Sequence, residues 1–440
     1  MDAVRDILAR LDPERVLASG PAFEAASRVW NDAVRHEPAV VVRPRSAAEV
    51  AVAVEVAREH GLPLSVRGGG HDWLGRAVRD GGLVVDLGAM RQVTVDAAER
   101  VATVEGGATV GDLIGAAAPH GLVAAAGTVG GVGLAGLTLG GGYGPLAGRF
   151  GLAADNLLGA EVVLADGRAV TAGDDLLWAL RGGGGNFGVV TAMRVRLHPA
   201  ARLLAGFAVY PWDDAAGVLS RLAEHLAAAP DELTVPSGVA GATGPAVFLG
   251  PVWCGAEDAG RAALSELLGV GTPLESTVAA VTYPELLARF EPYAAGGRHH
   301  AMRTRSVPAL TPGVVGALVA AGESRTSPLS GVVVHHFHGA AARVPDDATA
   351  FGERRDHLMV EIGAVWEPGP GEPHRAWAGE VRSALAPSAL PGGYPNLLRP
   401  EDHDQVAHAY GGNAARLRAV KARYDPDGVF TATPLPSPNS

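Results

Sequence analysis

Four clusters of glycine lie in the first half of the chain, at residues 68–70, 130–136, 140–144 and 182–188. Because glycine has no Cβ atom, the backbone N–H groups of such loops can close around phosphate oxygens. One cluster of this kind is usually a structural turn. Four clusters, with few lysines or arginines near them, indicate that backbone donors hold a long ligand that contains a diphosphate.

One of these clusters, Gly131-Val-Gly133-Leu-Ala-Gly136, matches the glycine pattern of dinucleotide-binding proteins, and Asp155 follows at about the distance of a ribose-binding acid. In those proteins the pattern opens a regular helix after a buried strand. Here three consecutive glycines at 140–142 end any helix after about one turn. A nicotinamide site is therefore the weaker interpretation, and the glycine–lysine pattern of a P-loop kinase is absent from the sequence.

Histidines gather on a predicted strand of the second half, Val332-Val-Val-His335-His336-Phe337-His338. Alternation along a strand places His336 and His338 on one face together with Val334. Imidazoles titrate near neutral pH, so these two side chains are candidate bases or donors in a substrate pocket, with polar contacts in the core as the alternative. Together with the pair at 299–300 they allow a metal site, but no acidic or cysteine ligands accompany them, and we predict none.

The glycine clusters carry further residues whose order and spacing resemble those of a flavoprotein family. The matching segments are Arg67-Gly-Gly-Gly-His71-Asp72, Gly127-Thr128, Leu137-Thr-Leu-Gly-Gly-Gly-Tyr143-Gly144, Gly151-Leu-Ala-Ala-Asp155-Asn156 and Arg181-Gly-Gly-Gly-Gly-Asn186-Phe187-Gly188. Together they resemble the FAD-linked oxidases of the berberine-bridge-enzyme-like type, which have the vanillyl-alcohol-oxidase fold. The second half agrees through residues 339–351, 365–366, 393–396 and 410–426, so the resemblance covers about residues 35–432.

The resemblance implies an FAD cofactor that is bonded through the imidazole of His71 to its 8α-methyl group. Many relatives add a thioether link from a cysteine in a Gly-Thr-Cys-Pro loop. The corresponding loop here is Gly127-Thr128-Val129-Gly130, so we expect no cysteinyl link, a weaker oxidant and a more open pocket. The resemblance assigns cofactor binding to Arg67, Gly68, Gly69, Gly70, His71, Asp72, Gly127, Thr128, Gly133, Gly136, Leu139, Gly140, Gly141, Gly142, Tyr143, Gly144, Asp155, Asn156, Gly185, Asn186, Gly188, Val190, Asn396 and Asn413.

The resemblance also implies a reaction. A base takes a proton from a hydroxyl, phenol or amine of a small molecule, hydride passes to the flavin, and O2 reoxidises the flavin to give hydrogen peroxide. Tyr394 is the first candidate base, because Gly393-Tyr394-Pro-Asn396 resembles a segment in which several members use a tyrosine. Since a phenol has a pKa near 10, Tyr394 needs a cationic or hydrogen-bonding neighbour.

Two other functions on the same scaffold stay open. In a dehydrogenase the electrons pass to an acceptor other than O2, and Leu134 beside the expected flavin would restrict the access of oxygen. A cyclase or binding protein would use the flavin scaffold without redox chemistry.

The composition excludes several classes of protein. Lys and Arg number 36 and Asp and Glu 47 among 440 residues, and the net charge of −11 disfavours nucleic acid or an anionic membrane as partner. Cys254 is the single cysteine, so no internal disulfide forms. Charged residues interrupt residues 1–16 where a signal peptide needs an apolar run, and we expect a cytoplasmic protein. We interpret the arginines at 298, 303 and 305 as a solvated basic edge, with attraction of an acidic substrate as the alternative.

The helices and strands expected along the chain indicate an α+β fold with two lobes, which must position the candidate site residues. We expect an FAD-binding lobe of the PCMH type over residues 1–202, a substrate lobe of antiparallel sheet backed by helices over 203–395, and a segment 396–440 that returns to the first lobe. Ser46 and Glu49 have the spacing of a capping box at the start of a helix. Asp166-Gly167 predicts a type I′ turn between strands at 161–165 and 168–171.

Overall fold

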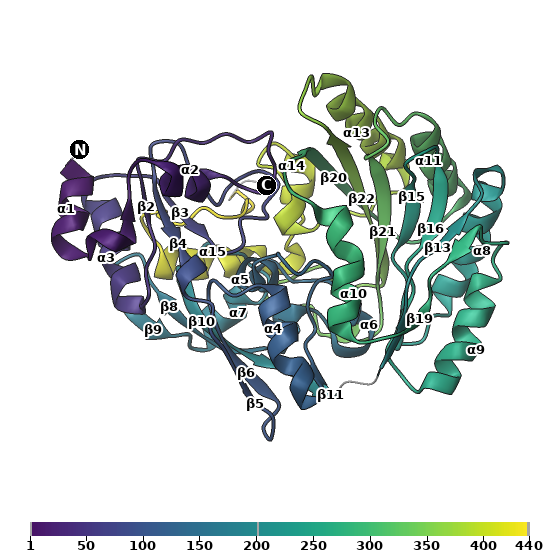
Figure 1. The fold of residues 1–440 in the computed structure, drawn as a ribbon, viewed down its shortest axis with the longest axis horizontal. Coiled ribbons are helices and arrows are strands. Elements are labelled where there is room, and N and C mark those ends of the chain that lie inside the picture. Colours follow the sequence, from purple (N-terminus) through teal and green to yellow (C-terminus); the bar gives the residue numbers. More distant parts are fainter. Residues whose placement is uncertain (1, 200–201, 438–440) are drawn as a thin grey trace.

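The computed structural model describes residues 2–199 and 202–437, which form two lobes side by side (Figure 1). The first lobe holds the N-terminal elements, a four-stranded sheet, a five-stranded sheet and a short two-stranded one. The second is built around a seven-stranded sheet whose outer face carries helices. The α+β architecture predicted from the sequence is confirmed.

The first sheet of the first lobe has the strand order β1-β2-β4-β3. Its strands β2 (Val40–Val42), β4 (Leu83–Asp86) and β3 (Leu64–Arg67) are parallel, and helix α3 (Ala47–Glu59) connects β2 to β3. Every residue of β2 and β4 is buried, which is why their sequences are apolar apart from Asp86 at the end of β4. The glycines at 68–70 directly follow β3 and so stand at the carboxyl edge of a parallel sheet.

The second sheet of this lobe is antiparallel. Its strands, in spatial order, are β5 (Val93–Asp96), β6 (Val101–Glu105), β10 (Val189–Arg196), β8 (Leu157–Val163) and β9 (Ala169–Thr171). Helices α4 (Val110–Ala117), α5 (Leu134–Leu139) and α7 (Asp174–Leu180) pack with it in one apolar core. Helix α5 has only six residues and ends at Gly140, which argues against the dinucleotide-binding pattern considered at 131–136.

Two local predictions need correction. Ser46 Oγ accepts from the backbone N–H of Glu49 at 3.3 Å, but the Glu49 carboxylate accepts from Arg45 instead of Ser46, so only half of the capping box forms. The turn after β8 is not type I′, because that type needs a positive φ at both Asp166 and Gly167. Gly167 has a φ of +83°, but Asp166 does not have a positive φ. A complete capping box forms at Thr109 and Asp112, at the start of α4.

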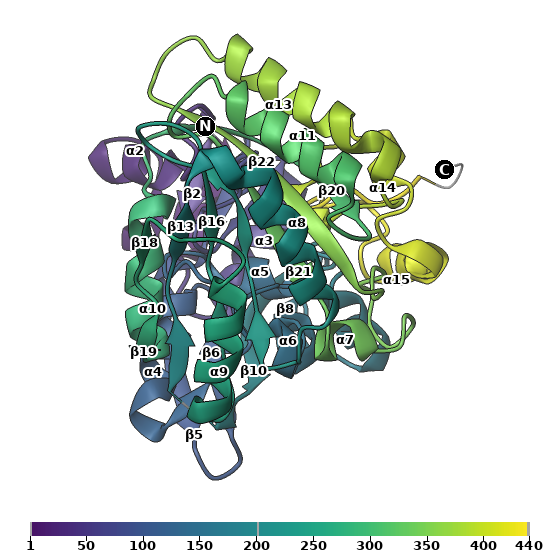
Figure 2. The same cartoon turned by 90° about the vertical axis from the view of Figure 1, so that its right-hand side faces the viewer.

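The seven-stranded sheet has the order β18-β13-β16-β15-β21-β22-β20 and antiparallel pairing throughout. The bounds of its strands are Glu275–Ser276 (β18), Ala208–Tyr210 (β13), Ala246–Leu249 (β16), Ser237–Ala240 (β15), Gly331–Phe337 (β21), His357–Trp366 (β22) and His299–Val307 (β20). Helices α8 (Ala215–Ala227), α11 (Pro312–Glu323) and α13 (Glu372–Leu385) cover one face, in front of the sheet in Figure 2. Val332, Val334, Val360 and Ile362 pack in the core beneath these helices. The residues between them, such as those at 333, 335 and 361, therefore belong to the face toward the first lobe (Figure 1).

Some residues of the range expected for the substrate lobe belong to the core of the first lobe. Helix α10 (Tyr283–Phe290) places Leu286 and Leu287 in that core, and the hydroxyl of Tyr283 donates to the carbonyl oxygen of Ala126 at 2.8 Å. Helix α15 (Ala414–Tyr424) also returns to the first lobe, where Leu417 is fully buried.

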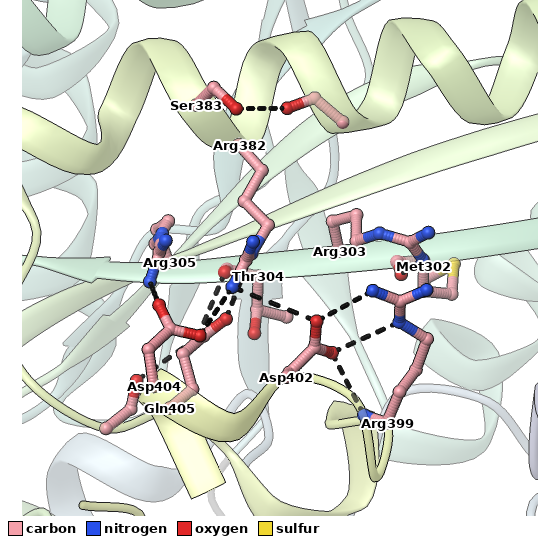
Figure 3. A network of polar contacts seen from close by, with 12 residues as sticks. Met302, Arg303, Thr304, Arg305, Arg382, Ser383, Arg399, Asp402, Asp404 and Gln405 are labelled. Atoms are coloured by element: carbon pink, nitrogen blue, oxygen red, sulfur yellow. Dashed lines mark hydrogen bonds and ion pairs between the residues drawn. The ribbon is translucent and has the colours of Figure 1, made fainter.

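A network of ion pairs fixes the C-terminal segment to the edge strand β20 (Figure 3). Asp402 accepts from Arg399 at 2.8 Å, and Arg382 on α13 donates to Asp404 at 2.9 Å. Arg305, only 12% exposed, also donates to Asp404. Arg305 is therefore not part of a solvated edge. It holds the short helix α14 (His403–Val406) against the sheet.

Candidate functional site

A cavity of about 550 Å³ lies where the loop after β3 meets two other glycine loops. Two of the predicted glycine clusters thus come together, although about 60 residues separate them. Arg43, Arg67 and Arg91 supply positive charge, and Asp86 and Glu291 negative charge. The full lining is Ala25, Arg43, Arg67, Gly68, Gly69, Asp86, Gly88, Arg91, Gly107, Thr109, Gly130, Gly131 and Glu291.

The loops approach so closely that only glycine fits. A Cβ atom on Gly69 would lie 2.3 Å from the backbone nitrogen of Gly133, and one on Gly133 would lie equally close to Gly69. Gly70 has a φ of +68°, which favours glycine for its backbone conformation. The facing loops thus present bare backbone to the same place, as a ligand with phosphate groups requires.

His71 lies at the border of this cavity. A Cβ atom on Gly131 would be 3.2 Å from Nε2 of His71, so the imidazole edge faces a loop that lines the cavity. One ring face stacks on the indole of Trp30, with 5.2 Å between the ring centroids and 20° between the planes. Burial lowers the pKa of His71 to about 4, so the imidazole is neutral at physiological pH.

Tyr394 stands between the lobes and is 5% exposed. Its hydroxyl oxygen accepts from the backbone N–H of Gly142 at 2.8 Å. Burial raises the pKa of Tyr394, while the N–H of Gly142 and the amide of Asn396 act in the opposite direction by stabilising the phenolate. Tyr394, the candidate base, thus lies beside the glycines at 140–142.

A cluster of polar side chains around Tyr143 was not predicted from the sequence. The hydroxyl of Tyr143 donates to Oε2 of Glu361 at 2.9 Å, and Nε2 of His335 lies 3.4 Å from the same oxygen. The ring of Tyr143 packs against His335 at 4.6 Å and edge-on against Tyr394 at 5.1 Å. Burial raises the pKa of Glu361, but the contacts with His335 and Tyr143 outweigh burial and the net shift is downward. Glu361 is the one charged residue in an otherwise apolar part of β22, 358–366, which was a detectable signal.

His336 and His338 do not join this cluster. Their rings stack on each other at 4.0 Å, and Nε2 of His336 lies 3.4 Å from Asp356. Alternation along β21 is as expected, but the face that carries Val334 is the face that the helices cover. The histidine of β21 on the opposite face is His335, which lies beside Glu361. His299 and His300 are also separate, since they pack against Trp366 and Trp30.

The comparisons with known proteins agree on a family. Residues 38–173 match the FAD binding domain family, and residues 393–434 match the family described as berberine and berberine like. The FAD-linked oxidoreductase aurO of Gibberella zeae is 34% identical over 94% of this chain and 83% of its own length. This chain belongs to the berberine-bridge-enzyme-like FAD-linked oxidoreductases.

Two further comparisons extend over nearly the whole chain. The (R)-6-hydroxynicotine oxidase of Paenarthrobacter nicotinovorans is 32% identical over 95% of both chains. The crystal structure of 6-hydroxy-D-nicotine oxidase from Arthrobacter nicotinovorans matches with a TM-score of 0.86 and 30% identity, over 96% of this chain and 97% of that one. A berberine bridge enzyme variant shares the fold, with a TM-score of 0.86 at 20% identity. This berberine-bridge-enzyme-like chain is thus an FAD-dependent oxidoreductase.

Several polar residues assigned to FAD by resemblance have protein partners in the structure. Asp155 pairs with Arg354 through two bonds of 2.9 and 2.6 Å, and the amide nitrogen of Asn156 donates to the carbonyl oxygens of residues 150 and 152. Asn186 bonds to Thr433, and Asn413 donates to the carbonyl oxygens of residues 346 and 349. The contacts of these side chains join distant loops, so we expect any contribution to FAD binding to be indirect.

Two other assigned glycines, Gly140 and Gly144, also lie too close to neighbouring atoms for a side chain. Gly140 packs so tightly on Asn396 that a Cβ atom would lie 2.1 Å from its amide nitrogen, and Asn396 donates to the carbonyl oxygen of Gly136 at 3.0 Å. A Cβ atom on Gly144 would meet the carbonyl oxygen of Ala126. The glycines and arginines that line the cavity fit the diphosphate of FAD, and the neutral His71 at its border fits the flavin. No helix in the described part of the chain is long and apolar enough to cross a membrane.

Proposed function

We propose that this protein is a flavin-dependent oxidase that removes hydride from an alcohol, a phenol or an amine-bearing small molecule of secondary metabolism. The observation that carries this proposal is the position of Tyr394, next to the glycines at 140–142 on one side and to Tyr143 on the other. Oxidases among the relatives, such as (R)-6-hydroxynicotine oxidase, support a small-molecule substrate and O2 as the acceptor.

We propose that His71 holds FAD covalently through its imidazole. Bond formation needs an unprotonated nitrogen, and burial keeps His71 neutral. No cysteine is present in the loop at 127–130, and Cys254 is buried beside Arg149 in the core of the first lobe. A single link through His71 is therefore the form of attachment that this chain allows.

The proposed role of Tyr394 is that of the base. When bound, FAD accepts hydride from the substrate and passes the electrons to O2. Tyr394, in its phenolate form, takes the proton from the substrate and becomes neutral. The N–H of Gly142 and the amide of Asn396 stabilise that phenolate before the transfer. Glu361 orients Tyr143 and adds negative charge at the same place, which suits a substrate that donates a hydrogen bond or carries a positive charge.

The test begins with the visible spectrum of the purified protein and of His71→Ala, before and after denaturation in SDS. We expect yellow, fluorescent flavin that stays with the wild-type polypeptide and separates from the variant. Candidate alcohols, phenols and amines are then supplied in air, with bleaching of the flavin and release of hydrogen peroxide as readouts. A colourless protein after incubation with FAD, or reduction by substrate that a quinone reoxidises and air does not, would overturn the oxidase proposal.

A further inference from the structure

The segment before β2 places Trp30 and Asn31 between the two lobes, next to the loop that carries His71. This segment has no regular secondary structure and lies outside the part of the chain that matches the FAD binding domain family, which begins at residue 38. Its contacts are nevertheless specific, and they reach both lobes.

Trp30 contacts the His71 loop through its backbone and its ring. The backbone N–H of Trp30 donates to the carbonyl oxygen of Gly70 at 2.9 Å, and the indole stacks on His71. The indole also stacks on His300 of β20, whose ring centroid lies 3.8 Å from that of the indole. The indole Nε1 donates to the carbonyl oxygen of Ala294 at 2.8 Å, which fixes the indole in its own plane.

Asn31 fastens the same segment to the edge of β20. Its side chain is buried, donates to the carbonyl oxygen of His300 at 3.0 Å and accepts from the backbone N–H of His300 at 2.9 Å. It also donates to the carbonyl oxygen of Trp73, two residues after His71. The backbone of the His71 loop is therefore held at Gly70, before His71, and at Trp73, after it.

We infer that Trp30 is a positioning residue for flavin attachment: its indole holds the His71 ring so that Nε2 faces the glycine loop at the cofactor cavity. This inference rests on the proposed link between His71 and FAD. The stacked indole covers one ring face and leaves the Nε2 edge beside Gly131. Asn31 supports the arrangement by holding the segment on β20.

The attachment that Trp30 assists is an oxidation. A bond forms between an imidazole nitrogen of His71 and the 8α carbon of FAD, and one C–H bond and the imidazole N–H bond break. The isoalloxazine takes up the two electrons and two protons. Dioxygen then oxidises it and is reduced to hydrogen peroxide, so each attachment consumes one O2.

The experiment compares wild type, Trp30→Leu and Trp30→Phe. Apoprotein from riboflavin-starved cells is incubated with FAD in air, and the flavin that stays with the polypeptide in SDS is followed with time. Binding before attachment is measured separately, by ultrafiltration with an FAD analogue that lacks the 8-methyl group and so cannot form the bond. Trp212→Leu is the matched control, because Trp212 is also a half-buried tryptophan but packs under α11, against Gly322.

Because a small misplacement of a reacting group has a large effect on rate, we expect Trp30→Leu to slow attachment at least about tenfold without weakening the initial binding of FAD. Trp30→Phe keeps an aromatic ring on His71 and is expected to restore most of the rate. Attachment by Trp30→Leu at the wild-type rate, or no rescue by Trp30→Phe, would overturn the positioning role alone. Wild-type protein that binds FAD but never attaches it would overturn the proposed link itself.

Discussion

At the scale of single residues, the chemistry of this protein depends on which neighbours a side chain has. Burial raises the pKa of Tyr394, and the hydrogen bonds from the N–H of Gly142 and the amide of Asn396 reduce that rise because they stabilise the phenolate. Tyr143 differs, because it donates to Glu361 and the negative charge there raises its pKa further. Of the two tyrosines, only Tyr394 has neighbours that stabilise its phenolate.

The first prediction concerns Tyr394→Phe. General base catalysis contributes about 10²–10⁴-fold, so we expect kcat to fall by at least about 100-fold while FAD stays bound. Tyr143→Phe is the control, for which we expect a smaller decrease. Stopped-flow reduction of the flavin by substrate measures both rates. Equal rates for wild type and Tyr394→Phe would assign the proton transfer to another group.

The second prediction concerns Glu361→Gln. The negative charge of Glu361 contributes to the raised pKa of Tyr394, so its removal favours the phenolate and lowers that pKa. Because a base acts in its deprotonated form, the rise of kcat/KM with pH is expected at lower pH in Glu361→Gln than in wild type. Glu367→Gln, whose side chain is 73% exposed, should leave the profile unchanged. An unshifted profile in Glu361→Gln would contradict the electrostatic coupling.

At the scale of elements, the shape of the candidate cofactor site depends on how closely two backbone loops approach each other. The loop after β3 and the loop before α5 meet at Gly69 and Gly133, where the backbone of one loop fills the space that a side chain of the other would need. The edge contacts of β20 have a different origin, since buried and half-buried ion pairs hold the C-terminal segment there (Figure 3).

The third prediction therefore compares two glycines. We expect Gly69→Ala to weaken FAD binding more than about tenfold, because its Cβ atom would collide with backbone, which cannot yield as a side chain can. Gly115→Ala in α4 is the control, because nothing lies within 4 Å of its new Cβ atom and alanine favours a helix. FAD titration of the apoproteins measures both. Unchanged affinity in Gly69→Ala would show that the loops open when FAD binds.

The fourth prediction concerns Asp402→Asn. Asp402 has a side chain only 6% exposed and accepts from Arg399, so its loss leaves the half-buried guanidinium of Arg399 without its charged partner. We expect a decrease in stability of about 1–3 kcal/mol, measured as a shift of the urea midpoint. Asp404→Asn removes a carboxylate that is 57% exposed and should cost less than about 1 kcal/mol. Equal shifts in the two variants would contradict a role for burial.

At the scale of the whole molecule, buried histidines link stability to pH. Burial lowers the pKa of His300 and of His338 to about 4. Both are neutral in the folded state, whereas the unfolded chain binds a proton near pH 6.5. Stability is therefore complete above about pH 6.5 and is lost as the pH falls toward 4.

The fifth prediction gives that loss a magnitude. A histidine with a pKa of about 4 in the folded state and about 6.5 in the unfolded state destabilises the fold by about 2 kcal/mol at pH 5 relative to neutral pH. We expect the urea midpoint of wild type to fall between pH 7 and 5, and His338→Gln to show a shallower fall. A midpoint independent of pH over this range would contradict the neutral buried state of these histidines.

The sequence by itself determined the family and the α+β fold and indicated the glycine loops, because these depend on local backbone conformation and on short motifs. The proposed roles of His71 and Tyr394 also come from such motifs. It did not determine which face of β21 meets the first lobe, since alternation is the same whichever face the helices cover. The tertiary structure made that choice by burying Val332 and Val334 under the helices, which left His335 beside Glu361. It also brought Trp30 to His71 and Arg305 to Asp404, contacts across 41 and 99 residues that arise only when distant apolar surfaces pack.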